Sequence, residues 1–131
     1  MKKLIKILLV SSENYNESFL VGKLAGFGEI IRVNSGSTGK KRLSAGLGFG
    51  GVIAASCVSG QQPTTLPFIR MARKISPKGQ IFGLSGVPGF REKMKKAGCN
   101  ITGDLKSMPG RIKAAFNRKN KKSIFKKLEL L

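Results

Sequence analysis

The sequence predicts an α/β fold in which a doubly wound, five-stranded parallel sheet carries helices on both faces. The chain has 131 residues, which suits one domain. Five short apolar segments alternate strictly with segments of helical spacing, the order typical of parallel strands joined by right-handed crossovers. The central segment, residues 51–58, is apolar on both alternations and has glycines before it and Ser59, Gly60 and Pro63 after it. This pattern indicates a strand that is buried on both faces.

The first half of the chain supplies the first two strands, of which the second suits an outer position. Residues 4–11 are apolar apart from Lys6 and predict the first strand. A helix follows, for which Asn14 and Asn16 are candidate caps and which Gly26 and Gly28 would end. Residues 29–33 predict a shorter second strand. Residues 34–50 are rich in glycine, so we expect only a short or frayed helix with flexible ends there.

The second half repeats the alternation after the central strand. Residues 63–75 predict a helix, residues 80–85 the fourth strand, and residues 90–97 the next helix, which Gly98 closes. Residues 101–105 predict a weak fifth strand, and Pro109 fits the first turn of the last helix. We therefore assign residues 1–117 to one α/β domain and residues 118–131 to a basic amphipathic tail. That tail could extend the last helix, dock on a partner, lie on an anionic membrane or contact phosphates.

Composition excludes several kinds of chemistry. The chain has no histidine, so His-dependent triads and His-ligated metals are ruled out, and its six carboxylates are scattered. Cys57 and Cys99 are too few for a disulfide framework and are expected to be reduced and buried. The basic, apolar N-terminus is too short for a signal peptide, and no apolar run reaches the length of a membrane span. We expect a cytoplasmic, non-enzymatic protein without a metal or other cofactor.

The positive charge of the chain points to an anionic partner. There are 25 Lys and Arg against 6 Asp and Glu, a formal net charge of +19, most of it after residue 65. A field of this size attracts polyanions by steering and by counterion release. Two glycine motifs do not predict a nucleotide site. Residues 36–41 (GSTGKK) have Lys41 where a phosphate-binding loop needs Ser or Thr, and residues 46–51 precede a strand instead of opening a helix.

Residues 4–118 resemble the receiver domain of bacterial response regulators. The resemblance rests on residues 7–13 (ILLVSSE), on an apolar third strand that ends at Ser56, on residues 81–85 (IFGLS) and on residues 95–98 (KKAG). It implies a flavodoxin-like fold with strand order 2-1-3-4-5. It also implies a phosphotransfer site, and the positions that correspond to that site here are Ser11, Ser12, Glu13, Ser56, Ser85 and, with a one-residue shift, Lys106.

In the receiver family, acidic residues after the first strand bind magnesium and an aspartate ends the third strand. This chain has Ser11, Ser12 and Ser56 at those positions, with Glu13 as the carboxylate nearby. Magnesium prefers carboxylate ligands, and a serine without a neighbouring base is a poor phosphoacceptor. We therefore interpret the chain as a pseudo-receiver of the two-component, phosphorelay type.

Two functions are compatible with these observations. The first is phosphorylation-independent binding of an acidic protein, or of a second copy of the chain, through the fourth helix, fifth strand and fifth helix. That surface carries Arg91, Lys93, Lys95, Lys96, Lys106, Arg111 and Lys113. The alternative is nucleic-acid binding through the same surface together with the tail, whose cations are Arg118, Lys119, Lys121, Lys122, Lys126 and Lys127.

Overall fold

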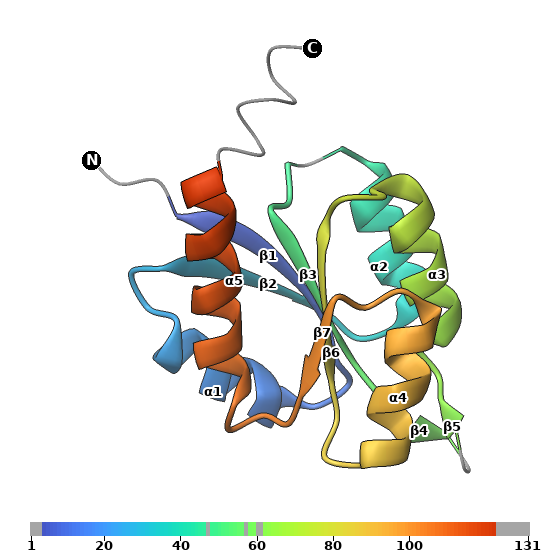
Figure 1. Cartoon of the computed structure of the whole chain (residues 1–131). Helices are drawn as coiled ribbons and strands as arrows, with labels where there is room; N and C mark the ends of the chain where they lie inside the picture. Colours follow the sequence, from blue (N-terminus) through green and yellow to red (C-terminus); the bar gives the residue numbers. More distant parts are fainter. Residues whose placement is uncertain (1–3, 47, 57, 60–61, 123–131) are drawn as a thin grey trace.

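Five parallel strands form a single sheet in the order β2-β1-β3-β6-β7 (Figure 1). The structure, a computed structural model, describes residues 4–46, 48–56, 58–59 and 62–122. The strands of this sheet are β1 (Ile5–Val10), β2 (Gly28–Val33), β3 (Gly51–Ala55), β6 (Gln80–Leu84) and β7 (Ile101–Gly103). They are the five predicted strands, and their order confirms the predicted arrangement 2-1-3-4-5.

Five helices cover the two faces of the sheet. They are α1 (Asn14–Lys23), α2 (Gly36–Ser44), α3 (Leu66–Ile75), α4 (Pro88–Ala97) and α5 (Met108–Lys122). Helices α1 and α5 lie on one face, and α2, α3 and α4 lie on the other (Figure 1). The chain thus has the doubly wound α/β architecture that its alternating pattern predicts.

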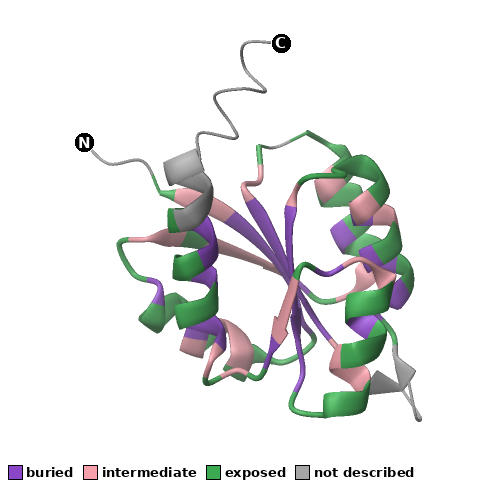
Figure 2. Ribbon diagram, in the orientation of Figure 1, coloured by how far each residue is buried: buried purple, intermediate pink, exposed green. Residues whose placement is uncertain are grey.

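Each face of the sheet has its own hydrophobic core. On the α1–α5 side, Phe82 and Phe116 pack together with their ring centroids 6.0 Å apart. On the other side, Phe68 and Met94 lie in the second core. Every residue of β3 and β6 is buried, so the middle of the sheet is purple in Figure 2. A Cβ atom on Gly51 would lie 2.8 Å from the ring of Phe116, so β3 needs glycine where α5 crosses it.

The central strand is shorter than predicted, because the chain turns back onto its own carboxyl end. The strand stops at Ala55, whose carbonyl oxygen accepts a hydrogen bond from Thr65 Oγ1 at 2.6 Å. The amide of Thr64 donates to the carbonyl of Ser56 at 2.9 Å. The intervening residues contain the antiparallel pair β4 (Val58–Ser59) and β5 (Gln62–Pro63), which the sequence did not predict.

The ends of α1 and α2 also differ from the expected ones. Glu13 is the cap residue of α1 and makes no side-chain capping bond, so neither Asn14 nor Asn16 is the cap. The helix ends at Lys23, before Gly26. Residues 36–44 form a helix whose N-cap is Ser35, and the Oγ of Ser35 accepts a hydrogen bond from the Thr38 amide at 3.3 Å. That serine cap stabilises a segment with low intrinsic helix propensity.

Arg73 joins three segments on the α3–α4 side. Its guanidinium donates to the carbonyl oxygens of Ser76 and Gly79, in the turn after α3, at 3.0 Å each. It also donates to the carbonyl of Gly98, at the end of α4, at 2.8 and 3.0 Å. Gly98 closes α4 with a φ of 139°, as the sequence predicted. The end of α3, the turn before β6 and the end of α4 are therefore held by one side chain.

The last helix continues beyond residue 117, the predicted end of the domain. Helix α5 runs to Lys122, so the first residues of the predicted tail are helical in their backbone. Lys126 and Lys127 lie outside the described residues. Within the described part of the chain, no helix is both long enough and apolar enough to cross a membrane.

Candidate functional site

A polar cavity of about 310 Å³ opens at the carboxyl edge of the sheet. Open parallel sheets bind their ligands at this edge. Strands β1, β3 and β6 deliver one group of side chains each, and the loop after β7 adds another. The lining residues are Ser11, Ser12, Glu13, Asn16, Ala55, Ser56, Leu84, Ser85, Gly86 and Leu105. The structure therefore brings together all the predicted receiver-site residues except Lys106.

Ser11 is buried, and its hydroxyl is already engaged in hydrogen bonds. Asn16 Nδ2 donates to Ser11 Oγ at 2.9 Å, and the amide of Glu13 donates to the same oxygen at 3.1 Å. The hydroxyl proton lies within reach of the Glu13 carbonyl at 3.3 Å. These bonds shape the turn between β1 and α1. Ser12 and Glu13 are exposed at this turn.

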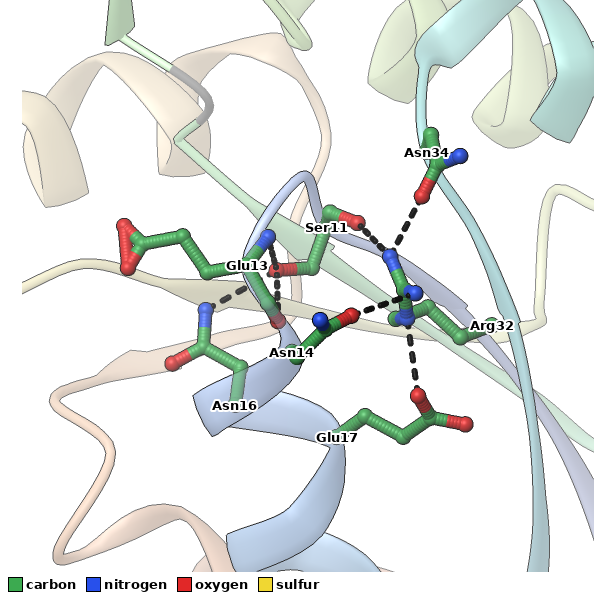
Figure 3. A network of polar contacts seen from close by, with 7 residues as sticks. All are labelled: Ser11, Glu13, Asn14, Asn16, Glu17, Arg32 and Asn34. Atoms are coloured by element: carbon green, nitrogen blue, oxygen red, sulfur yellow. Dashed lines mark hydrogen bonds and ion pairs between the residues drawn. The ribbon is translucent and has the colours of Figure 1, made fainter.

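Arg32, near the end of β2, holds the neighbouring loops together (Figure 3). Its guanidinium forms an ion pair with Glu17 Oε1 at 2.8 Å and donates to the carbonyl of Ser11 at 3.0 Å. It also donates to Asn14 Oδ1 at 2.7 Å and to Asn34 Oδ1. One cation therefore joins the end of β1, the first turn of α1 and the end of β2.

Ser56 and Ser85 come from adjacent strands. The Ser56 amide donates to the carbonyl of Leu84 at 3.1 Å, which continues the β3–β6 pairing by one residue. Ser85 is buried, and its Oγ accepts from the amide of Val87 at 3.1 Å. Arg91 Nη1 donates to the Ser85 carbonyl at 2.9 Å, so α4 supports the loop that carries this serine.

Lys106 lies apart from the cavity. It is exposed in the turn between β7 and α5, whereas its neighbour Leu105 lines the cavity. In the same turn, the amide of Ser107 donates to Asp104 Oδ1 at 2.9 Å. Hydrogen bonds from Ser107, with smaller contributions from Arg91 and Arg111, lower the pKa of Asp104 below its ordinary value.

The residues of this cavity do not fit a magnesium ion. Glu13 is the carboxylate among its lining residues, and the rest of its polar side chains are serine hydroxyls and the Asn16 amide. Among the described residues, no three His, Cys, Asp or Glu side chains gather into a group that could hold a metal. Magnesium is usually held by carboxylates, of which this site offers one.

The predicted basic surface is formed by α4, the turn after β7 and α5. Lys93, Lys95, Lys96, Lys106, Arg111 and Lys113 are exposed, and Arg91 is half-buried. We call these residues the α4–α5 basic surface. The backbone of Arg118, Lys119, Lys121 and Lys122 continues α5, but their side chains lie outside the described part of the structure, so the predicted role of the tail stays a prediction.

Sequence reasoning did not place Asn16, Arg32 or Asn34 at the site. A charged residue near the end of a strand rich in isoleucine was a detectable signal, because an arginine there needs acceptors. The sequence does not show which acceptors Arg32 binds. Glu17 and Asn14 lie on α1, and only the β1–β2 register brings them to Arg32.

Comparison with known proteins identifies the fold. No known family profile matches the chain, and no curated protein matches it in sequence. Solved receiver domains match it in three dimensions. A CheY-like response regulator receiver domain protein from Methanospirillum hungatei superposes with a TM-score of 0.74 at 12% identity, over 92% of this chain and 99% of that one.

Two further structures agree. A response regulator receiver domain protein from Clostridium thermocellum gives a TM-score of 0.70 at 21% identity, over 89% of this chain and 98% of that one. A candidate response regulator from Chloroflexus aurantiacus gives a TM-score of 0.70 at 18% identity, over 90% of this chain and 97% of that one. At these identities the likeness establishes the fold, which is the CheY-like, flavodoxin-like fold of receiver domains.

Proposed function

We propose that this chain is a cytoplasmic, non-enzymatic binding module with the receiver fold, which acts without an aspartyl phosphate and engages an acidic protein partner. One observation carries the proposal. The cavity at the strand ends presents Ser11, Ser12 and Ser56 at the positions where the receiver family has its acids, with Glu13 as its carboxylate.

Phosphoryl transfer to this cavity would lack two requirements. A metal that neutralises the phosphoryl oxygens needs more hard, charged ligands than Glu13 supplies. A serine nucleophile needs a neighbouring base, and no lining residue besides Glu13 can serve as one. In addition, the hydroxyl of Ser11 already accepts bonds from Asn16 and from the Glu13 amide, so it belongs to the scaffold.

The α4–α5 basic surface supports an acidic partner. The side chains of Lys95, Lys106 and Lys113 are exposed and come from α4, the β7–α5 turn and α5. Complementary charge raises the association rate and disfavours basic partners. The occupant we propose is an acidic segment of another protein, and a second copy of this chain is a poorer fit because its net charge is +19.

The phosphorylation arm of the proposal is tested with acetyl phosphate and Mg²⁺. The intact chain should show no mass increase, and calorimetry should show no Mg²⁺ binding. The double variant Ser12→Asp, Ser56→Asp places two carboxylates beside Glu13 and should gain Mg²⁺ binding. Phosphate uptake by the unmodified chain would contradict the proposal.

The binding arm is tested with a glutamate-rich peptide as the probe. The triple variant Lys95→Glu, Lys106→Glu, Lys113→Glu should weaken peptide binding by tenfold or more at 50 mM salt. A matched variant, Lys41→Glu, Arg70→Glu, Lys74→Glu, changes the net charge equally on a different surface and should retain most of the affinity. Equal losses in both variants would mean that net charge alone attracts the peptide.

A further inference from the structure

A second, larger cavity lies between α2 and α3. Its volume is about 590 Å³, and it opens beside the carboxyl ends of β1 and β2. Its lining residues are Ser12, Asn34, Ser35, Gly36, Ser37, Lys40, Thr64, Pro67, Phe68 and Met71. Apart from Ser12, none of these residues lines the polar cavity at the ends of β1, β3 and β6 or belongs to the α4–α5 basic surface.

The walls of this cavity differ in chemistry. Pro67, Phe68 and Met71 from α3 form an apolar wall. Phe68 packs closely against α2 at its two glycines, since a Cβ atom added to Gly36 or Gly39 would lie 3.1 or 2.9 Å from its side chain. The opposite wall carries amide and hydroxyl groups, and Lys40 is the charged residue of the lining. A ligand with a flat apolar body, polar edges and a negative charge would match all three features.

Exposed cations lie along α2, along α3 and in the turn that leads from α3 into β6, and Lys40 among them lines the cavity. We call them the α2–α3 basic surface: Lys40, Lys41, Arg42, Arg70, Lys74 and Lys78. In the described part of the chain these side chains make no hydrogen bond or ion pair, whereas Arg73 donates to several backbone carbonyls and to Asn100 Oδ1. Six cations with no counter-charge would repel one another, so this surface is suited to a polyanion.

The composition of the surface favours nucleic acid over protein. Lysine is depleted in the cores of protein–protein interfaces, and four of the six cations of this surface are lysines. Among the large apolar residues of α2 and α3, Ile75 is the one that is exposed, at 48%. A phosphate backbone needs cations and no apolar centre.

We propose that this cavity and the α2–α3 basic surface together bind single-stranded nucleic acid. One base enters the cavity against Pro67 and Met71, with its polar edge toward Asn34 and Ser37, and the flanking phosphates lie on the exposed cations. A base can leave its strand for such a cavity only where it is unpaired, so a duplex should bind less well. This inference goes beyond the proposed function, since it uses another surface and another partner.

The test is fluorescence anisotropy with a labelled 12-nucleotide uridine oligomer and a duplex of the same length, using the intact chain. If about three phosphates are contacted, the plot of log affinity against log salt has a slope near −2 for the single strand, which means a fall of about 20-fold from 50 to 200 mM salt. The variant Lys41→Glu, Arg70→Glu, Lys74→Glu should lose most of this affinity and flatten the slope. The matched variant Lys95→Glu, Lys106→Glu, Lys113→Glu should keep both.

A third variant tests the cavity itself. Ser37→Leu places an apolar side chain at the lining without changing charge, so it should weaken the single strand by several-fold and leave duplex binding unchanged. Three results would overturn the inference: no binding at 50 mM salt, equal losses in the two triple variants, or displacement of the oligomer by the glutamate-rich peptide. Because acetyl phosphate uptake and peptide binding are measured separately, failure here leaves the proposed function standing, and the reverse also holds.

Discussion

Replacing Arg32 with methionine removes the cation that joins β1, α1 and β2 while keeping a side chain of similar length. The Arg32 side chain is 19% exposed and Glu17 is 37% exposed, so water can solvate the carboxylate that is left behind, and their pair contributes at most about 1 kcal/mol. The carbonyl of Ser11 is part-buried and loses its 3.0 Å donor, which costs roughly 1–2 kcal/mol. We expect Arg32→Met to lower the free energy of unfolding by about 1–3 kcal/mol, a fall in Tm of about 4–12 °C.

Urea unfolding followed by circular dichroism measures this effect as a lower urea concentration at the midpoint, with the same dependence of the unfolding free energy on urea concentration. Arg42→Met is the matched control, because Arg42 is exposed and makes no hydrogen bond or ion pair in the described part of the chain, so its loss should change the unfolding free energy by less than about 0.5 kcal/mol. A double-mutant cycle with Glu17→Gln isolates the ion pair. If Arg32→Met matched its control, the polar network would have no role in stability.

Three further predictions concern two glycines and the buried cysteine. Gly39→Ala should destabilise the protein by roughly 1–3 kcal/mol, since the new Cβ would lie 2.9 Å from both Phe68 and Val10. Gly22→Ala in α1 is the contrast: its Cβ would meet nothing within 4 Å, so it should stabilise the protein by about 0.5–1 kcal/mol. Thermal unfolding of both variants tests this, and equal shifts in Tm would contradict it. Burial raises the pKa of the Cys99 thiol to about 12, so in a Cys57→Ser background a thiol reagent at pH 8 should react only as the protein unfolds. Because the unfolded thiol loses its proton at lower pH than the folded one, Cys99 should also reduce stability as the pH rises from about 9 towards 12, and a Cys99→Ala variant should lack that decline.

The fold was predictable because its signals are local and repeated. Strands that are buried on both faces, such as β3 and β6, read as short apolar runs, and their alternation with helical patterns determines a parallel sheet. Helix α2 was predicted poorly because its glycines lower helix propensity. Gly39 is required instead by the close approach of Phe68, a contact between residues that are distant in sequence.

The candidate sites show the same difference between local signals and contacts that depend on the folded chain. The serines of the carboxyl edge follow strands directly, so Ser11, Ser56 and Ser85 could be placed from the order of the strands. The Arg32 network depends on the β1–β2 register, and the larger cavity depends on the distance between α2 and α3. The early end of β3 likewise depends on the bond from Thr65 to the carbonyl of Ala55, which no single-segment pattern contains.

Arg73 has a consequence for how the molecule opens. Its guanidinium occupies carbonyl oxygens that belong to the end of α3, the turn before β6 and the end of α4, so none of these segments can separate from the others while those bonds persist. Local fraying at the end of α3 therefore requires release of the end of α4 as well. In the native ensemble the two helix ends therefore form one cooperative unit of exchange with solvent.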